Sequence, residues 1–445
     1  MKRALSVLLL SATLCFSGCG SDKAAQETAA SGQLNYSEKT ITAVQILTDG
    51  DMNGFYALFD ENMRKNNSKP ELQVIWNKLS EQYGDFQYYL SDVTISSNAG
   101  YHIADVPCVF DNGTVTFHLT FNNAGEISSF DVIEGQEPSG SPRLRQDTEV
   151  SFGSQDYPLS GSLTLPDGSG PFPAVILVQD SGSYDRNEQI GPNIPFFELA
   201  DQLAQQGVAV LRYDNRTYSY DTASSQEGFT VQDEIIDDII AAVDFLNSRN
   251  IIDPEQIYIA GHGFAGYLMP RIAEQTPDAA GYIMLAAAAR PAEDLLLEQT
   301  QYVLQTEKNL KDDAKEQLLQ QTETIVANIK QVTADSAFSE QELYNLPASY
   351  WLDLQNYDPL TQVQQVKRPM LFIQGGRDYQ VSTVDFELWQ SALQDEPDVL
   401  FHYNDNLNHL FMSGTGKSTP SEYQQKETVS SDVSSVITNF IKQRY

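Results

Sequence analysis

The sequence predicts an α/β protein with a doubly wound, mostly parallel eight-stranded sheet, preceded by a small α+β domain. In residues 145–445, apolar strand-like runs alternate with helical patterns, which is typical of a parallel sheet covered by helices. In residues 35–136, helical patterns come first and a series of alternating runs follows. A turn-rich stretch at 137–144 separates the two patterns and is the predicted linker.

The first domain is predicted to pack its helices on one face of a curved antiparallel sheet. Helical patterns cover Glu38–Leu47, Met52–Lys65 and Pro70–Tyr83, and alternating runs cover Phe86–Ile95, His102–Phe110, Thr114–Phe121 and Ile127–Ile133. Turns rich in Asn and Gly between the runs indicate hairpins. The order resembles the nuclear-transport-factor-2-like cone fold. His102 and His118 stand alone in strands, so we interpret them as sheet-face residues.

The second domain carries eight strand candidates, and its central ones are continuous apolar runs, as expected for strands buried on both faces. The candidates are Thr148–Phe152, Leu159–Leu165, Ala174–Val178, Val208–Arg212, Ile257–Ala260, Tyr282–Ala286, Met370–Gln374 and Val399–Tyr403. Eight strands with a hairpin-like pair first match the α/β-hydrolase architecture. Residues of about 290–350 are predicted to form a helical cap over the sheet edge; a solvated insertion is the alternative.

Composition excludes some functions. The chain has 27 Lys and Arg against 61 Asp and Glu, which gives a net charge of −34. No basic stripe is available to neutralise phosphates, so we expect no nucleic acid partner. The same acidity argues against electrostatic docking on anionic lipid. No His, Cys or Asp cluster has the spacing of metal ligands, so we expect no metal site.

The N-terminus predicts export and a lipid anchor. Lys2-Arg3 precedes a short apolar run, and Phe16-Ser17-Gly18-Cys19 resembles a bacterial lipobox. Residues 1–18 are therefore the predicted signal peptide, Cys19 the lipidation site and 19–34 a flexible tether. The membrane would then be reached through the lipid alone; ordinary secretion is the alternative. Besides Cys19, the mature chain has only Cys108, so it has no internal disulfide.

The stretch Ile257–Gly266 resembles the nucleophile elbow, a tight turn from strand to helix with the pattern G-x-S-x-G. Gly261 takes the first position of the pattern and Ala265 the last. Gly263 stands where the pattern has its nucleophilic serine. The turn is thus of the type that presents a catalytic serine, but the serine is absent.

A histidine and an acid follow the last two strand candidates. Asp378 comes after the seventh, on a glycine turn, and His409 comes just after the eighth. Carboxyl ends of parallel strands share one sheet edge, so we predict that these side chains meet opposite Gly263 and form the acid and base of a triad. A turn-capping role for Asp378 and a structural role for His409 are the alternatives.

Four stretches together resemble the bacterial esterase EstD family of α/β-hydrolases, which is related to serine aminopeptidase-like and dienelactone hydrolase-like enzymes. They are Asp185-Arg186-Asn187-Glu188, Leu211-Arg212-Tyr213-Asp214-Asn215-Arg216, Gly375-Gly376-Arg377-Asp378-Tyr379-Gln380-Val381 and Leu407-Asn408-His409-Leu410-Phe411. The resemblance implies hydrolysis of small carboxylic esters without a cofactor. It also implies that the backbone N–H groups of Ser181 and Phe264 form the oxyanion hole.

Two departures from that family count against activity. Gly263 replaces the serine, and Gln179-Asp180-Ser181-Gly182 stands where the family has His-Gly-Ser-Gly. Asp180 would place a carboxylate where negative charge develops. A missing serine alone could be a laboratory substitution; two changes at one site fit natural loss better. Attack by the Ser181 hydroxyl is a further alternative.

Three functions follow from this reading. The first is an esterase scaffold, impaired by Gly263 and anchored outside the cell. The second is a pseudoenzyme that binds an ester, acyl or peptide-like ligand in its cleft. The third is an envelope protein whose N-terminal domain binds a partner. The sequence leaves the ligand and the oligomeric state open.

Overall fold

The computed structural model describes residues 36–442 except 91–92, 99–100, 135–141, 144–146, 221–227, 307 and 309. The predicted signal peptide, the tether and Cys19 lie outside these residues. The described chain forms two compact units that divide between Asp147 and Thr148. No helix within the described ranges has the length and apolar character needed to cross a membrane.

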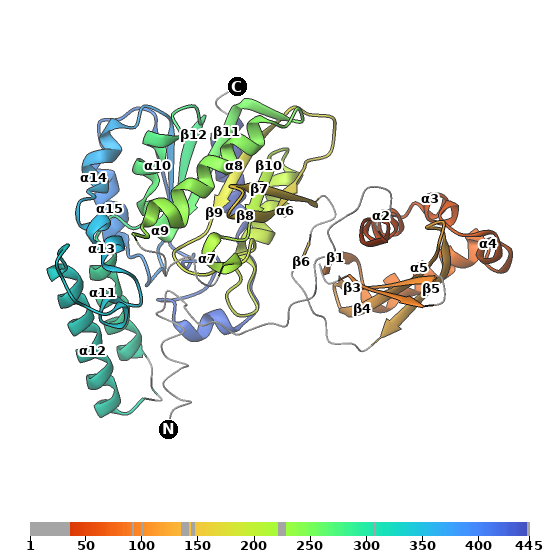
Figure 1. Ribbon diagram of the computed structural model, residues 1–445, viewed down its shortest axis with the longest axis horizontal. Helices are drawn as coiled ribbons and strands as arrows, with labels where there is room; N and C mark the ends of the chain where they lie inside the picture. Colours follow the sequence, from red (N-terminus) through yellow and green to blue (C-terminus); the bar gives the residue numbers. More distant parts are fainter. Residues whose placement is uncertain are drawn as a thin grey trace. The chain divides into compact units, whose positions relative to one another are not determined.

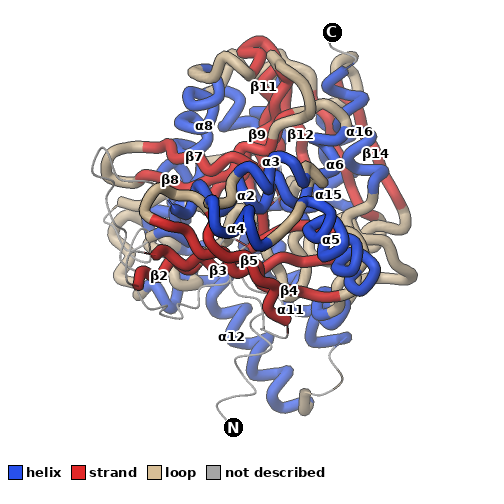
Figure 2. Tube along the Cα trace, turned by 90° about the vertical axis from the view of Figure 1, so that its right-hand side faces the viewer, coloured by secondary structure: helices blue, strands red, loops and turns tan. Residues whose placement is uncertain are grey.

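The smaller unit is a curved antiparallel sheet with helices gathered on one face (Figure 2). Its helices are α2 (Tyr36–Thr48), α3 (Met52–Ala57), α4 (Glu61–Asn66) and α5 (Lys69–Tyr83), and its strands are β1 (Phe86–Leu90), β2 (Thr94–Asn98), β3 (Tyr101–Phe110), β4 (Gly113–Asn122), β5 (Ile127–Glu134) and β6 (Pro142–Arg143). The strand order is β5-β4-β3-β1-β6, with β2 paired to β3. The core of this unit is rich in Phe. Cys108 is a buried free thiol in that core.

Three details differ from the sequence prediction. The single run expected over Phe86–Ile95 forms two strands, β1 and β2, which pair with different parts of β3. The single helix expected over Met52–Lys65 is divided, because Phe59 forms a β-bridge with Ile127 and Asp60 caps α4 by accepting from the Met63 N–H. The stretch predicted as a linker also contributes β6, which pairs with β1 and so extends the small sheet.

The larger unit is built on an eight-stranded mixed sheet (Figure 1). Its strands are β7 (Asp147–Gly153), β8 (Pro158–Thr164), β9 (Phe172–Val178), β10 (Ala209–Tyr213), β11 (Ile252–His262), β12 (Gly281–Leu285), β13 (Met370–Gly375) and β14 (Val399–Asn404). The order is β14-β13-β12-β11-β9-β10-β8-β7; β9 to β14 run parallel and β8 runs antiparallel to β10. The predicted doubly wound, mostly parallel sheet is therefore confirmed.

Helices cover both faces of this sheet. They are α6 (Pro195–Gln205), α7 (Arg216–Ser219), the π-helix η2 (Gln232–Ile236), α8 (Asp237–Asn247), α9 (Gly263–Tyr267), α10 (Met269–Gln275), α14 (Pro359–Gln362), η4 (Val363–Gln365), α15 (Thr383–Ala392), η5 (Pro420–Gln424) and α16 (Ser431–Lys442). α6 and α16 pack together on one face, and α8 and α10 lie on the other (Figure 1). The carboxyl ends of the parallel strands remain free of these layers.

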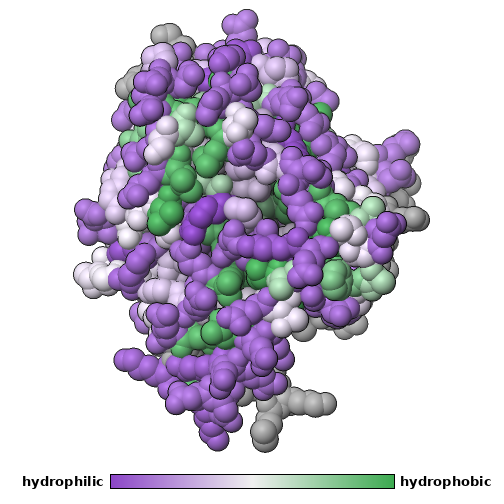
Figure 3. All heavy atoms as spheres, turned by 90° about the vertical axis from the view of Figure 1, so that its left-hand side faces the viewer, coloured by the Kyte–Doolittle hydropathy of each residue, from purple (hydrophilic) through white to green (hydrophobic). Residues whose placement is uncertain are grey.

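Between β12 and β13 the chain forms α11 (Ala292–Thr306), α12 (Asp312–Gln331), η3 (Glu340–Leu343) and α13 (Ala348–Gln355). α11 and α12 pack against each other as a helical hairpin. These helices occupy the residues for which a cap was expected. The face of the unit on this side is mostly hydrophilic, with small scattered hydrophobic areas (Figure 3), which fits a solvated surface rather than a broad apolar docking face.

Candidate active site

The elbow forms where β11 ends and α9 begins. β11 ends at His262, and Gly263 has a φ of +50°, in the left-handed region that glycine tolerates best. One residue earlier, a Cβ on Gly261 would lie 2.7 Å from the carbonyl carbon of Ala265. Small residues are therefore required for the turn to close. Its tip faces the carboxyl edge of the sheet.

The structure brings the predicted acid and base together. Asp378 lies in the turn after β13, where its Oδ1 accepts from the N–H groups of Gln380 and Val381 at 2.8 and 3.0 Å. Its Oδ2 is 2.7 Å from Nδ1 of His409, in the loop after β14. Both side chains are buried. This arrangement fixes the imidazole with Nε2 directed into the site, as a general base requires.

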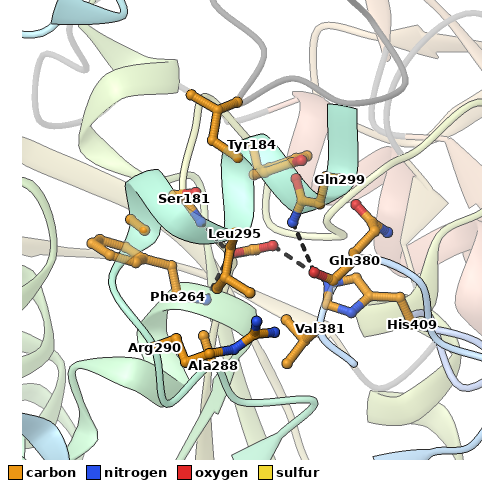
Figure 4. A pocket seen from close by; sticks show the side chains of 13 residues that line it. Ser181, Tyr184, Phe264, Ala288, Arg290, Leu295, Gln299, Gln380, Val381 and His409 are labelled. Atoms are coloured by element: carbon orange, nitrogen blue, oxygen red, sulfur yellow. Dashed lines mark hydrogen bonds and ion pairs between the residues drawn. The ribbon is translucent and has the colours of Figure 1, made fainter. Parts of the chain in front are cut away.

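The carboxylate of Asp180, just after β9, occupies the space between His409 and the elbow. Its Oδ1 accepts from the backbone N–H groups of Ser181 and Phe264, both at 2.7 Å. Its Oδ2 is 3.5 Å from Nε2 of His409. Ser181 and Phe264 lie on one side of the pocket and His409 on the other (Figure 4). The two N–H groups expected to stabilise a substrate oxyanion are thus used by a side chain of the protein.

The same carboxylate fills the space of the missing serine. A Cβ built on Gly263 would lie 2.5 Å from each carboxylate oxygen of Asp180. Real Cβ atoms essentially never come so close to other heavy atoms. Gly263 and Asp180 are therefore a matched pair: the glycine gives the room that the carboxylate takes.

The charges of Asp180, Asp378 and His409 affect the pKa values of Asp180 and His409. Burial lowers the pKa of His409, but the carboxylates of Asp378 and Asp180 outweigh it and raise the pKa to about 10. Burial raises the pKa of Asp180, yet the hydrogen bond and charge of His409 and the Phe264 N–H lower it below its ordinary value. At neutral pH the resting site holds an imidazolium between two carboxylates.

A second buried pair, which the sequence analysis did not identify as functional, supports the site. Glu188 has a φ of +51°, and both its carboxylate oxygens lie 3.0 Å from Nδ1 of His262. Glu188 also accepts from the backbone N–H of Asp180, and Nε2 of His262 lies 3.0 Å from the carbonyl oxygen of His409. The pair thereby connects the loop after β9, the elbow and the loop that carries His409. The sequence signal for Glu188 was the stretch Asp185-Arg186-Asn187-Glu188, which resembles the EstD family but to which no role was assigned.

Arg186 also holds the loop between β9 and α6, which carries Asp180 and Glu188. Its guanidinium donates to Asp214 at 2.6 Å, to Glu149 at 3.0 Å and to the Ser162 hydroxyl at 2.9 Å. The arginine side chain is 8% exposed and that of Asp214 is 16% exposed, so their pairing is shielded from solvent. The loop that carries Asp180 is therefore tied to β7, to β8 and to the end of β10. The Asp214 contact is shielded from solvent, whereas Glu149 is 42% exposed.

A pocket of about 660 Å³, including its open mouth, lies over Asp180 and His409. Its apolar wall includes Leu295 and Leu296 of α11, and polar groups on it include Tyr184 and Gln299. Figure 4 shows Tyr184, Leu295 and Gln299 among the side chains that line the pocket together with His409. The insertion between β12 and β13 thus supplies part of the pocket wall. Among the described residues, no group of three or more His, Cys, Asp or Glu could hold a metal ion.

This combination of sheet, elbow and His–Asp pair defines an α/β-hydrolase. A family model described as "Serine aminopeptidase, S33" matches residues 195–414, and one described as "Protein of unknown function (DUF3887)" matches residues 42–130. Esterase EstD of Thermotoga maritima is 33% identical over 394 residues, covering 88% of this chain and 92% of that protein. The chain belongs to the esterase EstD family.

Among solved structures, an esterase of Pyrococcus furiosus is 17% identical with a TM-score of 0.42, covering 67% of this chain and 90% of its own. Est1E of Butyrivibrio proteoclasticus is 16% identical with a TM-score of 0.42, covering 66% of this chain and 98% of its own.

Proposed function

We propose that this protein is an extracytoplasmic, lipid-anchored member of the EstD family in which serine-type ester hydrolysis is impaired. The observation that carries the proposal is the position of the Asp180 carboxylate. It accepts from both oxyanion-hole N–H groups and excludes a side chain at Gly263. An ester carbonyl in this pocket would find neither a serine at the elbow nor free donors for its oxyanion.

The matched exchange supports natural change rather than a laboratory substitution of the serine. Removing a serine side chain would explain Gly263 but would leave a different residue at position 180. Here the second residue has the size and hydrogen-bonding capacity to use the space left by the first. The two changes fit each other, as expected for a site that was altered as a unit.

The proposal is tested by assaying the purified mature chain on a short p-nitrophenyl ester, with and without a serine-directed phosphonate. We expect hydrolysis at the background rate and no covalent labelling. Rapid turnover with labelling of Ser181 would instead assign the nucleophile to that hydroxyl and contradict the proposal.

A non-catalytic binding function is the second candidate, and the pocket favours it. Leu295 and Leu296 of α11 give the pocket apolar surface, and polar groups such as Tyr184 and Gln299 also line it, a mixture that is typical of small-molecule sites. Such ligands are the expected partners, and nucleic acid is not. Thermal stabilisation of the parent protein by a non-hydrolysable ester analogue, without turnover, is the expected result for this function.

The lipid anchor is tested separately. The signal pattern motivates the expectation that Cys19→Ala moves the protein from the membrane fraction to the medium or the soluble envelope fraction. Fractionation and immunoblotting measure this, with Cys108→Ala as the matched control that keeps the anchor. Unchanged membrane association of the Cys19→Ala protein would contradict lipidation.

A further inference from the structure

We propose that Asp180 is itself a nucleophile, and that the site hydrolyses small alkyl electrophiles, compounds in which a saturated carbon carries a leaving group that departs as an anion. This goes beyond the proposed function, which concerns only the loss of serine chemistry. The product would be an alcohol.

The orientation of the carboxylate is the first support. Oδ1 is fixed by the N–H groups of Ser181 and Phe264, which leaves Oδ2 directed toward Nε2 of His409. The Asp180 side chain is 26% exposed and lines the pocket, whereas the Asp378 side chain is fully buried. One carboxylate oxygen can thus reach a bound molecule while the other is held.

The position of the N–H donors selects the type of substrate. Attack on an ester carbonyl creates an oxyanion on the substrate, and both donors already serve Asp180. Attack on a saturated carbon creates no such oxyanion. In that step a bond forms between Oδ2 and the carbon, the bond to the leaving group breaks, and the leaving group departs with the electron pair. The product is a neutral alkyl ester of Asp180.

The same donors are well placed for the second step. Water attacks Cγ of the Asp180 ester while His409 Nε2 takes a proton from it. Negative charge then develops on Oδ1, which already accepts from the two N–H groups. The intermediate collapses, and the alkoxide leaves and takes the proton from His409. This leaves the carboxylic acid of Asp180, whose proton passes to the neutral His409 and restores the carboxylate and the imidazolium of the resting site. The donors therefore stabilise an oxyanion of the protein instead of one of the substrate.

The charges of the resting site are consistent with this sequence. Asp180 stays ionised because its pKa is lowered, which makes it a poor proton acceptor but leaves an anionic nucleophile. Alkylation removes one of the two carboxylate charges that raise the pKa of His409. His409 then gives up its proton more readily, so the first step prepares the base for the second.

The pocket suits a small apolar group. Leu295, Leu296 and Val381 offer aliphatic surface beside the carboxylate. Gln299 also lines the pocket; its Nε2 donates to the Gln380 carbonyl oxygen at 2.9 Å and carries a second N–H for the departing anion.

The first test traps the alkylated protein. The His409→Gln protein, which lacks the base for the second step, is incubated with 1-bromobutane and digested, and the peptide masses are measured by mass spectrometry. We expect a butyl group on Asp180, and none in Asp180→Asn/His409→Gln. Asp335→Asn/His409→Gln, altered at an exposed loop carboxylate, is the matched control and should be labelled like His409→Gln. Absence of label from Asp180 in folded His409→Gln protein would overturn the proposal.

The second test needs no variant. A single turnover of the parent protein in H₂¹⁸O should place ¹⁸O in the Asp180 carboxylate and leave the first alcohol unlabelled, because water attacks the protein ester. Direct incorporation into the first alcohol would mean that water attacks the substrate and would overturn the proposal, as would an absence of bromide release. A p-nitrophenyl ester assay on the same preparation measures serine-type hydrolysis independently. Failure of the proposal for Asp180 can therefore be distinguished from failure of the proposal that serine-type hydrolysis is impaired.

Discussion

The double variant Gly263→Ser/Asp180→Gly should hydrolyse a short p-nitrophenyl ester at least about a hundredfold faster than the parent. A serine next to His409 restores the nucleophile–base pair, which contributes about 10²–10⁴-fold. Removing the carboxylate frees the N–H groups of Ser181 and Phe264, each of which is typically worth about 10²–10³-fold. The Asp378–His409 pair is already in place at 2.7 Å.

The two single variants are the matched controls. Gly263→Ser alone should stay near background and lose stability, because its Cβ would lie 2.5 Å from the Asp180 carboxylate oxygens and its φ of +50° is strained for serine. The strain alone is of the order of 1–3 kcal/mol. Asp180→Gly alone frees the donors but lacks a nucleophile, so it should also stay near background.

Steady-state rates of all four proteins, with thermal unfolding of each, give the measurement. A large gain in the double variant and little in either single variant is the expected pattern. If the double variant folds and remains at the parent's rate, the geometry around His409 has changed beyond these two residues, and binding becomes the better-supported function.

The second large effect is on stability. Arg186→Met should lower the free energy of unfolding of the larger unit by about 3–5 kcal/mol, the usual loss when one partner of a buried ion pair is removed. Methionine retains an apolar stem of similar length but leaves the largely buried Asp214 without its guanidinium. The resulting uncompensated charge is the main cause of the expected loss.

Lys330→Met is the control for this measurement. It also removes a cation from a carboxylate, here Asp294, but both side chains are 41–49% exposed. We expect a change below about 1 kcal/mol because solvent screens the pair. Urea unfolding followed by fluorescence and circular dichroism compares the two. Equal small losses would show that the Arg186 cluster does not hold the loop as described.

The sequence was sufficient to predict the sheet, the elbow and the acid–base pair, because each depends on local patterns repeated along the chain. Continuous apolar runs specified the strands, and the strand ends placed Asp378 and His409 at one edge. Asp180 was expected to oppose an oxyanion, but its occupation of the hole depends on a side-chain rotamer and on the distance to Gly263. The break at Phe59 depends on a distant partner, Ile127, so helical periodicity alone missed it.

The contact between positions 180 and 263 also restricts the order in which this site can have changed. A side chain at 263 and the present Asp180 conformation exclude each other, so a serine-bearing ancestor would first have had to lose its serine side chain before the carboxylate could settle in the hole. The reverse change meets the same conflict, because a serine restored at position 263 alone would clash with the Asp180 carboxylate. Two coordinated substitutions therefore separate the present site from one with a serine at the elbow, because either substitution alone meets this steric conflict or leaves the site without a nucleophilic serine.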